Sequence, residues 1–151
     1  EHNGYVISFC DAVFLTPEIV QDTLRRIEDS QGDLVLHYVE KQAFVDENLP
    51  ASRTYIPIAG KEYTGSTIYY VKHFSSLLAA TPKLAKLRKV RKSPEKLLES
   101  IGCTGKDLPE IEESLSEELG IDVKICVSPH ARLGMDVDKP SDLDLAIELL
   151  D

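Results

Sequence analysis

The sequence predicts a three-layer α/β sandwich with a mixed, mainly parallel sheet. Apolar runs of strand length alternate along the chain with segments of helical periodicity, in the order βαβ(β)ααβα. No internal repeat or low-complexity linker interrupts this alternation. With 151 residues, 42% of them apolar, the chain is long enough to bury a core, and we expect a single domain over residues 1–151.

The first part of the chain predicts two strands and a helix. The run GYVISFC, residues 4–10, is continuously apolar, which is typical of a strand covered on both faces. A Thr-Pro-Glu start and the apolar spacing after it predict a helix over residues 16–29. DLVLHYVEK, residues 33–41, predicts a second strand, and its partial alternation favours a place nearer an edge. Residues 42–60 have mixed polarity, so we expect a loop or short irregular strands there.

The middle of the chain predicts a long strand followed by helices. Residues 61–74 read as a strand with an internal Thr-Gly-Ser break. A glycine inside a strand often marks a bulge or a place where a ligand approaches the backbone. Residues 75–102 have a helical pattern, which we expect to break near Pro82 and again at Ser93-Pro94.

The last part predicts two helices around a strand. Residues 107–119 place their leucines and isoleucine on one helical face. Residues 121–129 form an apolar run of strand length, and Ser141 is in position to cap a terminal helix.

The charge pattern excludes some classes of protein. The net charge of −9 argues against non-specific nucleic-acid binding, which requires a basic surface. No apolar run approaches the roughly 20 residues of a membrane span, so we expect no membrane partner. Residues 83–96 are nevertheless basic, and residues 107–122 are acidic. Both runs are typical of solvated helix faces, while the basic run could also attract a phosphorylated ligand.

Three cysteines are present, an odd number, without the spacing of a structural zinc site. A disulfide framework is therefore not expected, and a reducing cytoplasm fits this pattern.

Acidic residues follow two of the predicted strands. Asp11 comes directly after the first strand, while Asp136 and Asp138 come between the last strand and the terminal helix. A spacing of two places both carboxylates on one face of an extended segment. Ligands of α/β sheets bind at strand ends, and Mg²⁺ takes one or two carboxylates plus substrate phosphates. The sequence therefore predicts a shared Mg²⁺ site, with a simple helix entrance as the alternative.

Two stretches carry a family resemblance, ISFCDAVFLTPEIV at 7–20 and GMDVDKPSDLDLAIELL at 134–150. They resemble the MobA-like nucleotidyltransferases, which have a nucleotide-diphospho-sugar-transferase-like fold and belong to the NTP transferase superfamily. The resemblance implies that Asp11 and Asp138 hold the catalytic Mg²⁺, with Asp136 as a supporting or alternative ligand.

The resemblance also suggests where the acceptor binds. It implies that the strand segment Thr64-Gly65-Ser66 lies under the acceptor, and this is the weaker match. A lysine normally assists in such enzymes, and Lys61, Lys41 and Lys72 are the candidates. His130 lies near the predicted site in sequence, but a loop histidine is more often a bystander.

The function implied is Mg²⁺-dependent transfer of a nucleoside monophosphate from a nucleoside triphosphate to a small anionic or phosphorylated acceptor, with release of pyrophosphate. The family's Gly-rich phosphate loop, with its Arg and Lys, has no counterpart in this sequence. We therefore expect the resemblance to cover the C-terminal portion of an NTP-transferase-like domain, with catalysis requiring an N-terminal portion. The alternative is a non-catalytic binding or scaffold domain that retains the fold and contacts partners through its acidic helices.

Overall fold

A five-stranded mixed sheet forms the centre of the molecule, in a computed structural model that describes residues 4–90 and 92–150. Its strands are β1 (Tyr5–Ser8), β2 (Leu34–Glu40), β3 (Ile56–Ile58), β4 (Lys61–Val71) and β5 (Val123–Ser128). The order is β1-β4-β2-β5, and β3 pairs with β4 outside this path. The mixed sheet is as predicted. Its neighbouring strands are, however, mostly antiparallel rather than mainly parallel. Strand β4 runs opposite to β1, β2 and β3, whereas β2 and β5 pair in parallel.

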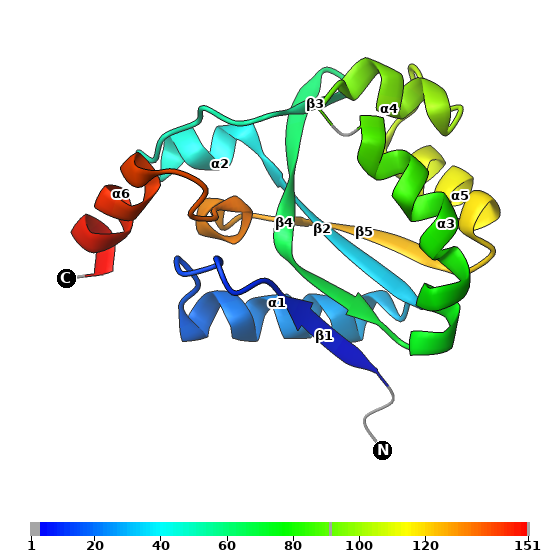
Figure 1. Ribbon diagram of the computed structural model, residues 1–151, viewed down its shortest axis with the longest axis horizontal. Helices are drawn as coiled ribbons and strands as arrows, with labels where there is room; N and C mark the ends of the chain where they lie inside the picture. Colours follow the sequence, from blue (N-terminus) through cyan, green and yellow to red (C-terminus); the bar gives the residue numbers. More distant parts are fainter. Residues whose placement is uncertain (1–3, 91, 151) are drawn as a thin grey trace.

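Helices cover both faces of this sheet, which confirms the α/β fold class (Figure 1). The helices are α1 (Pro17–Ser30), α2 (Lys41–Asp46), α3 (Phe74–Val90), α4 (Pro94–Ser100), α5 (Leu108–Leu119) and α6 (Pro140–Leu150), with a 3₁₀ turn, η1 (Ala131–Gly134). In Figure 1, α3, α4 and α5 gather on one side of the sheet, and α1 lies on the other. No helix in the described ranges has the length and apolar character needed to cross a membrane.

Two apolar cores lie on opposite faces of β2. Leu34 belongs to the core under α3, α4 and α5, whereas Val39 belongs to the core that α1, α2, η1 and α6 share. Successive strand residues point to opposite faces, so a strand buried on both sides supplies both cores. β2 is therefore an interior strand, and the prediction that it lies nearer an edge is wrong.

β1 shows the opposite error. The continuous apolar run predicted a strand covered on both faces, but Tyr5 is 57% exposed and Val6 47% exposed. Within the described residues, β1 pairs only with β4 and ends the sheet. An apolar run indicates that a segment can form a strand, but it does not indicate how many strands and helices will pack against that strand.

Helix starts agree with the sequence where a side chain caps the backbone. The Ile19 amide donates to Thr16 Oγ1 at 3.4 Å, and Asp107 forms a reciprocal capping box with Glu110. The predicted Ser141 cap is wrong, because α6 already begins at Pro140.

Two further expectations about helices fail. Residues 42–60 were expected to lack a helix, but α2 lies at their start. Helix α3 continues through Pro82 instead of breaking there, while the break before Pro94 is present. A proline inside a helix removes one backbone hydrogen bond, and packing on the remaining turns can hold the helix together.

A bulge interrupts the pairing of β4 with β2. Tyr38 pairs with Gly65, but Leu36 pairs with Tyr69, so β4 carries the extra residues. Ser66 stabilises the bulge, since its hydroxyl accepts from the Ile68 amide at 3.2 Å and donates to the Ile68 carbonyl at 2.7 Å. The glycine in the predicted strand therefore does mark a bulge.

Candidate metal centre

Two loops meet at the carboxyl ends of β1 and β5. One follows β1 and carries Asp11, and the other follows η1 and carries Asp136 and Asp138. The Val137 amide donates a hydrogen bond to the Asp11 carbonyl at 3.2 Å, which ties the loops together. Phe14, just after Asp11, has no exposed surface, so a buried anchor holds the first loop.

The second loop alternates between buried and acidic residues. Met135 is fully buried and extended, and Asp136 and Asp138 follow it at a spacing of two. Alternation in an extended segment sends the apolar side chains inward and the carboxylates toward one side. The local sequence thus aims both acids at Asp11, which reaches them from the other loop.

The three carboxylates converge. Asp11, Asp136 and Asp138 each offer one oxygen, and these oxygens all lie within 4.8 Å of one another. Two oxygens that ligate one Mg²⁺ at about 2.1 Å each can be at most about 4.2 Å apart. Neighbouring ligands in an octahedral shell are closer, about 3.0 Å apart, so the side chains would have to move together by an ångström or two in order to close on an ion. The geometry fits a hard divalent cation, and carboxylate oxygen is the ligand that Mg²⁺ prefers.

One oxygen of Asp11 supports this fit independently. Asp11 Oδ1 is buried and has no hydrogen-bond partner among the described residues. A buried carboxylate oxygen without a partner carries a large desolvation cost, so such an atom in a native fold requires an explanation. A cation bound by the three acids would supply the missing interaction.

Sequence reasoning missed Arg53. Its Nη1 lies 2.9 Å from Asp136 Oδ1, its guanidinium lies over the Phe44 ring at 5.7 Å, and its Nε is buried without a described partner. The ion pair occupies one oxygen of Asp136, so Asp11 and Asp138 have more freedom to ligate an ion. A single arginine in an irregular loop carries no sequence signal for this contact, which joins residues 83 positions apart.

Three candidate substrate residues on β4, Thr64, Gly65 and Ser66, have different surroundings. Thr64 is beside η1, since a Cβ built on Gly134 would lie 3.2 Å from its methyl group. A Cβ built on Gly65 would meet no atom within 4 Å, so its backbone faces open space. The Ser66 hydroxyl is used in the bulge. The role of this segment in acceptor binding stays a prediction.

The candidate lysines are held in ion pairs with acids at distances of 2.7 to 3.6 Å. Lys61 pairs with Glu40, Lys41 with Glu62, and Lys72 with Asp33. The hydrogen bond that Lys61 donates to Glu40 raises the pKa of Lys61, and the one that Lys41 donates to Glu62 raises the pKa of Lys41. Lys61 and Lys41 lie near the carboxyl end of β2, whereas Lys72 follows the far end of β4.

His130 is engaged elsewhere. Its Nε2 lies 3.2 Å from Asp22 Oδ2 on α1, and Arg26 Nε also contacts Asp22, at 2.7 Å. The Arg26 hydrogen bond lowers the pKa of Asp22, which keeps that carboxylate charged. This cluster ties α1 to the loop after β5.

The chain was compared with protein families, curated proteins and solved structures. No protein-family profile matches the chain, and no curated protein matches it in sequence. The chain is similar to a hypothetical transferase from Thermus thermophilus, with 25% identity and a TM-score of 0.76. The match covers 94% of this chain and 64% of the Thermus chain.

The chain has a transferase-like fold. This chain spans about two thirds or less of the length of the Thermus chain. The similarity thus supports the coarse part of the sequence resemblance, the transferase fold, and the MobA-like assignment stays a prediction.

Proposed function

We propose that this chain forms the cation-binding side of a Mg²⁺-dependent nucleotidyltransferase site of the MobA-like kind. The site would transfer a nucleoside monophosphate from a nucleoside triphosphate to a small anionic or phosphorylated acceptor. One observation carries the proposal most: three carboxylates converge beyond the strand ends, and one of them, Asp11, has a buried oxygen, Oδ1, without a described partner. The transferase-like fold is consistent with it.

Each acid has a distinct part in this proposal. Asp11 and Asp138 hold the ion, and Arg53 orients Asp136 from the side through their 2.9 Å contact. Bound Mg²⁺ would neutralise the charge that develops on the phosphates and would orient them for in-line attack. The protein contributes positioning, because the Val137–Asp11 backbone hydrogen bond and the buried Phe14 keep the two loops in register.

The remaining candidates serve the acceptor. Thr64 lies beside η1, and Ser66 maintains the bulge next to Gly65. The exposed Lys61 can meet an anionic acceptor by exchanging its partner Glu40 for the acceptor's charge. Arg53 has a buried Nε without a described partner and is the second cation available to a phosphate.

Cation binding tests the centre apart from catalysis. Mn²⁺, followed by its electron paramagnetic resonance signal, is titrated into the 151-residue chain, and Mg²⁺ is added as competitor. We expect one saturable site, with an affinity that Asp11→Asn reduces at least about tenfold. Asp144→Asn is the matched control, since it removes the same charge from the exposed side of α6. Equal loss in both variants, or no saturable site, would contradict the proposal.

Activity is then measured on the longest natural chain that contains these residues. Each of a panel of nucleoside triphosphates is incubated with Mg²⁺ and phosphorylated acceptors, and pyrophosphate release is recorded. Release that requires Asp11 and Asp138 supports nucleotidyl transfer. Cation binding without release from any triphosphate would favour the alternative, a binding or scaffold domain.

A further inference from the structure

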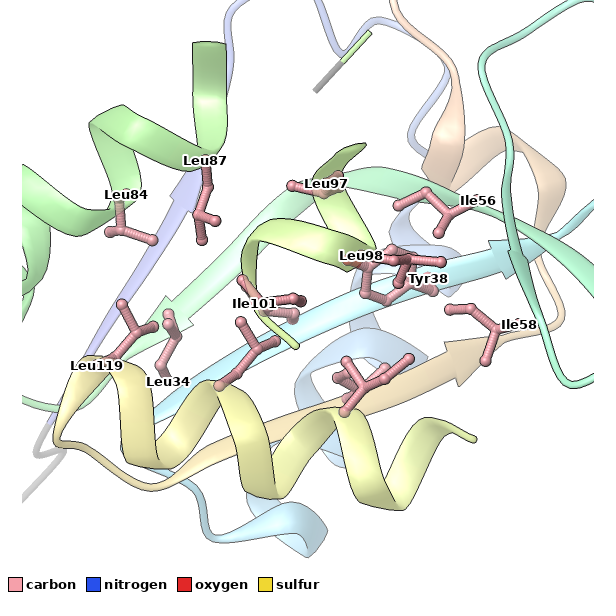
Figure 2. A pocket seen from close by; sticks show the side chains of 14 residues that line it. Leu34, Tyr38, Ile56, Ile58, Leu84, Leu87, Leu97, Leu98, Ile101 and Leu119 are labelled. Carbon is pink, nitrogen blue, oxygen red and sulfur yellow. The ribbon is translucent and has the colours of Figure 1, made fainter. Parts of the chain in front are cut away.

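A cavity of about 260 Å³ lies between the sheet and helices α3, α4 and α5 (Figure 2). Among the side chains that the structure describes, fourteen line it, and every one is Leu or Ile except Tyr38. Burial raises the pKa of Tyr38 to about 12, so the described side chains of the lining carry no charge at neutral pH. The β2 side chains in the lining alternate with Val39, which belongs to the core beside the acid loops. The cavity therefore lies across the sheet from the candidate metal centre.

The size and lining of this space suit an alkyl chain. Apolar cavities of about 150 Å³ in other proteins stay free of water and accept benzene. At the same density, this cavity has room for a chain of roughly ten carbons. An unfilled cavity destabilises a fold in proportion to its volume, so an apolar occupant would stabilise this one.

Lysines gather where the covering helices join. Leu87 on α3 and Leu97 on α4 both line the cavity. Lys92 lies between the two helices, and Lys96 lies within α4, next to Leu97 in sequence. Both lysines are exposed, and neither has an ion pair or hydrogen bond with the residues that the structure describes. In a chain with a net charge of −9, this is a place where an anion meets positive charge instead of repulsion.

We propose that this cavity binds the hydrocarbon tail of a single-chain amphiphile of roughly ten carbons, whose carboxylate or phosphate head contacts Lys92 and Lys96. The apolar lining selects the tail, and the lysines select the sign of the head. The site is separate from the acid cluster, and it does not depend on the nucleotidyltransferase proposal.

Five probes of three kinds, with the amphiphilic ones used below their micellar concentrations, test this inference on the whole chain. Decanoate and decyl phosphate carry both features, decanol lacks the charge, and acetate and inorganic phosphate lack the tail. We expect saturable one-to-one binding of an anionic probe in calorimetry and a rise of a few degrees in Tm. Decanol should bind at least about tenfold more weakly, and the tailless anions should not bind. The stronger of the two anionic probes identifies the head group.

Variants separate tail from head. Lys92→Gln/Lys96→Gln should weaken anionic probes at least about tenfold and leave decanol unchanged. The matched control Lys72→Gln/Lys124→Gln also removes two positive charges, at positions outside α4 and the segment before it, and should change affinity less than about twofold. Leu115→Phe should fill the cavity, raise Tm without ligand and abolish binding. If Leu115→Phe fails to fold, the lysine variants still decide.

Two results would overturn the inference. One is the absence of saturable binding by either anionic probe up to about 1 mM. The other is equal affinity for decanol and the anions with no effect of the lysine pair. Asp11→Asn should leave amphiphile binding unchanged, so a failed metal centre and a failed cavity give different results.

Discussion

Asp138 and Asp142 lie close together in sequence, and their carboxylates have different tasks. Asp142 Oδ2 accepts hydrogen bonds from the backbone amides of Asp138 at 3.1 Å and Lys139 at 3.2 Å, at the start of α6. The Asp138 carboxylate points instead into the group with Asp11 and Asp136. The segment therefore contains both a helix entrance and a candidate cation ligand, carried by different acids.

Substituting each acid separates these tasks. Asp138→Asn should lower Mn²⁺ affinity at least about tenfold, because it removes a charged ligand. It should not lower the free energy of unfolding of the metal-free protein, because without a metal the Asp138 charge is repelled by the two neighbouring carboxylates. Asp142→Asn should lower the free energy of unfolding by about 0.3–1 kcal/mol and leave Mn²⁺ affinity within about twofold. Mn²⁺ titration and urea unfolding of both variants provide the comparison. The reverse pattern would show that Asp138 only opens the helix.

His37 is a buried ionisable residue on β2, with 1% of its surface exposed. Burial, assisted by the positive charge of Arg26, lowers the pKa of His37 to about 4. The unfolded chain takes up a proton near pH 6.5, and the folded chain does so only near pH 4. Stability is therefore complete above about pH 6.5 and is lost as the pH falls toward 4, by at most about 3 kcal/mol.

Urea unfolding between about pH 7.5 and pH 5 measures this contribution. His37→Leu should flatten the slope of unfolding free energy against pH over that range. The control His73→Gln changes an exposed histidine and should keep the wild-type slope. If His37→Leu keeps that slope as well, the acid sensitivity arises from other groups.

At the scale of elements, helix starts differ in how much their side chains contribute. Asp107 accepts from the Glu110 amide at 3.0 Å, and the Glu110 carboxylate accepts from the Asp107 amide at 2.9 Å. Ser93 occupies the corresponding place before α4 but makes no capping hydrogen bond with its side chain. Ser and Asp are both residue types that cap helices, but the sequence shows only which residue type is present and not which rotamer it adopts.

Alanine substitution at these two starts should have unequal effects. Asp107→Ala should lower the free energy of unfolding by about 1 kcal/mol, because it removes the cap of α5. Ser93→Ala should change it by less than about 0.5 kcal/mol. Chemical denaturation of both variants beside the wild type gives the two values. Equal losses would mean that the Ser93 hydroxyl also caps its helix in solution.

At the scale of the whole molecule, β1 leaves an apolar edge. Tyr5 is 57%, Val6 47% and Phe9 55% exposed, and Phe74 at the start of α3 contacts the Tyr5 ring at a centroid distance of 6.0 Å. An edge strand with large apolar side chains offers backbone and surface to another chain. We expect the isolated chain to self-associate as its concentration rises.

Lysine at this edge tests the expectation. Val6→Lys should reduce association in sedimentation velocity experiments, since a charge on an edge strand opposes pairing with another strand. Its control is Ile147→Lys on α6, where the side chain is 54% exposed but belongs to no strand. The edge assignment is wrong if Ile147→Lys disperses the protein and Val6→Lys does not.

Much of the local structure could be read from the sequence. The Thr16 cap, the helix over 108–119, the break before Pro94 and the bulge at Gly65 all depend on signals within a few residues. Such signals act through local hydrogen bonds, fixed backbone angles and side-chain periodicity, which a short window of sequence contains.

The sequence also determined the candidate acids. Asp136 and Asp138 share a face because of their spacing, and their place after the last strand brought them to the end of the sheet where Asp11 lies. Because ligands of α/β sheets bind at the carboxyl ends of strands, the proximity of these acids could be predicted. Cation binding itself stays a prediction for the Mn²⁺ titration.

Tertiary structure alone decided the rest. It made β2 an interior strand and β1 an edge, placed Arg53 against Asp136 across 83 positions, and left a cavity under α3, α4 and α5. Each of these features depends on which distant segments pack together, and a residue's own neighbours in sequence do not encode its neighbours in space. Local preference sets what each segment can be, and the joint packing of all segments sets where it lies.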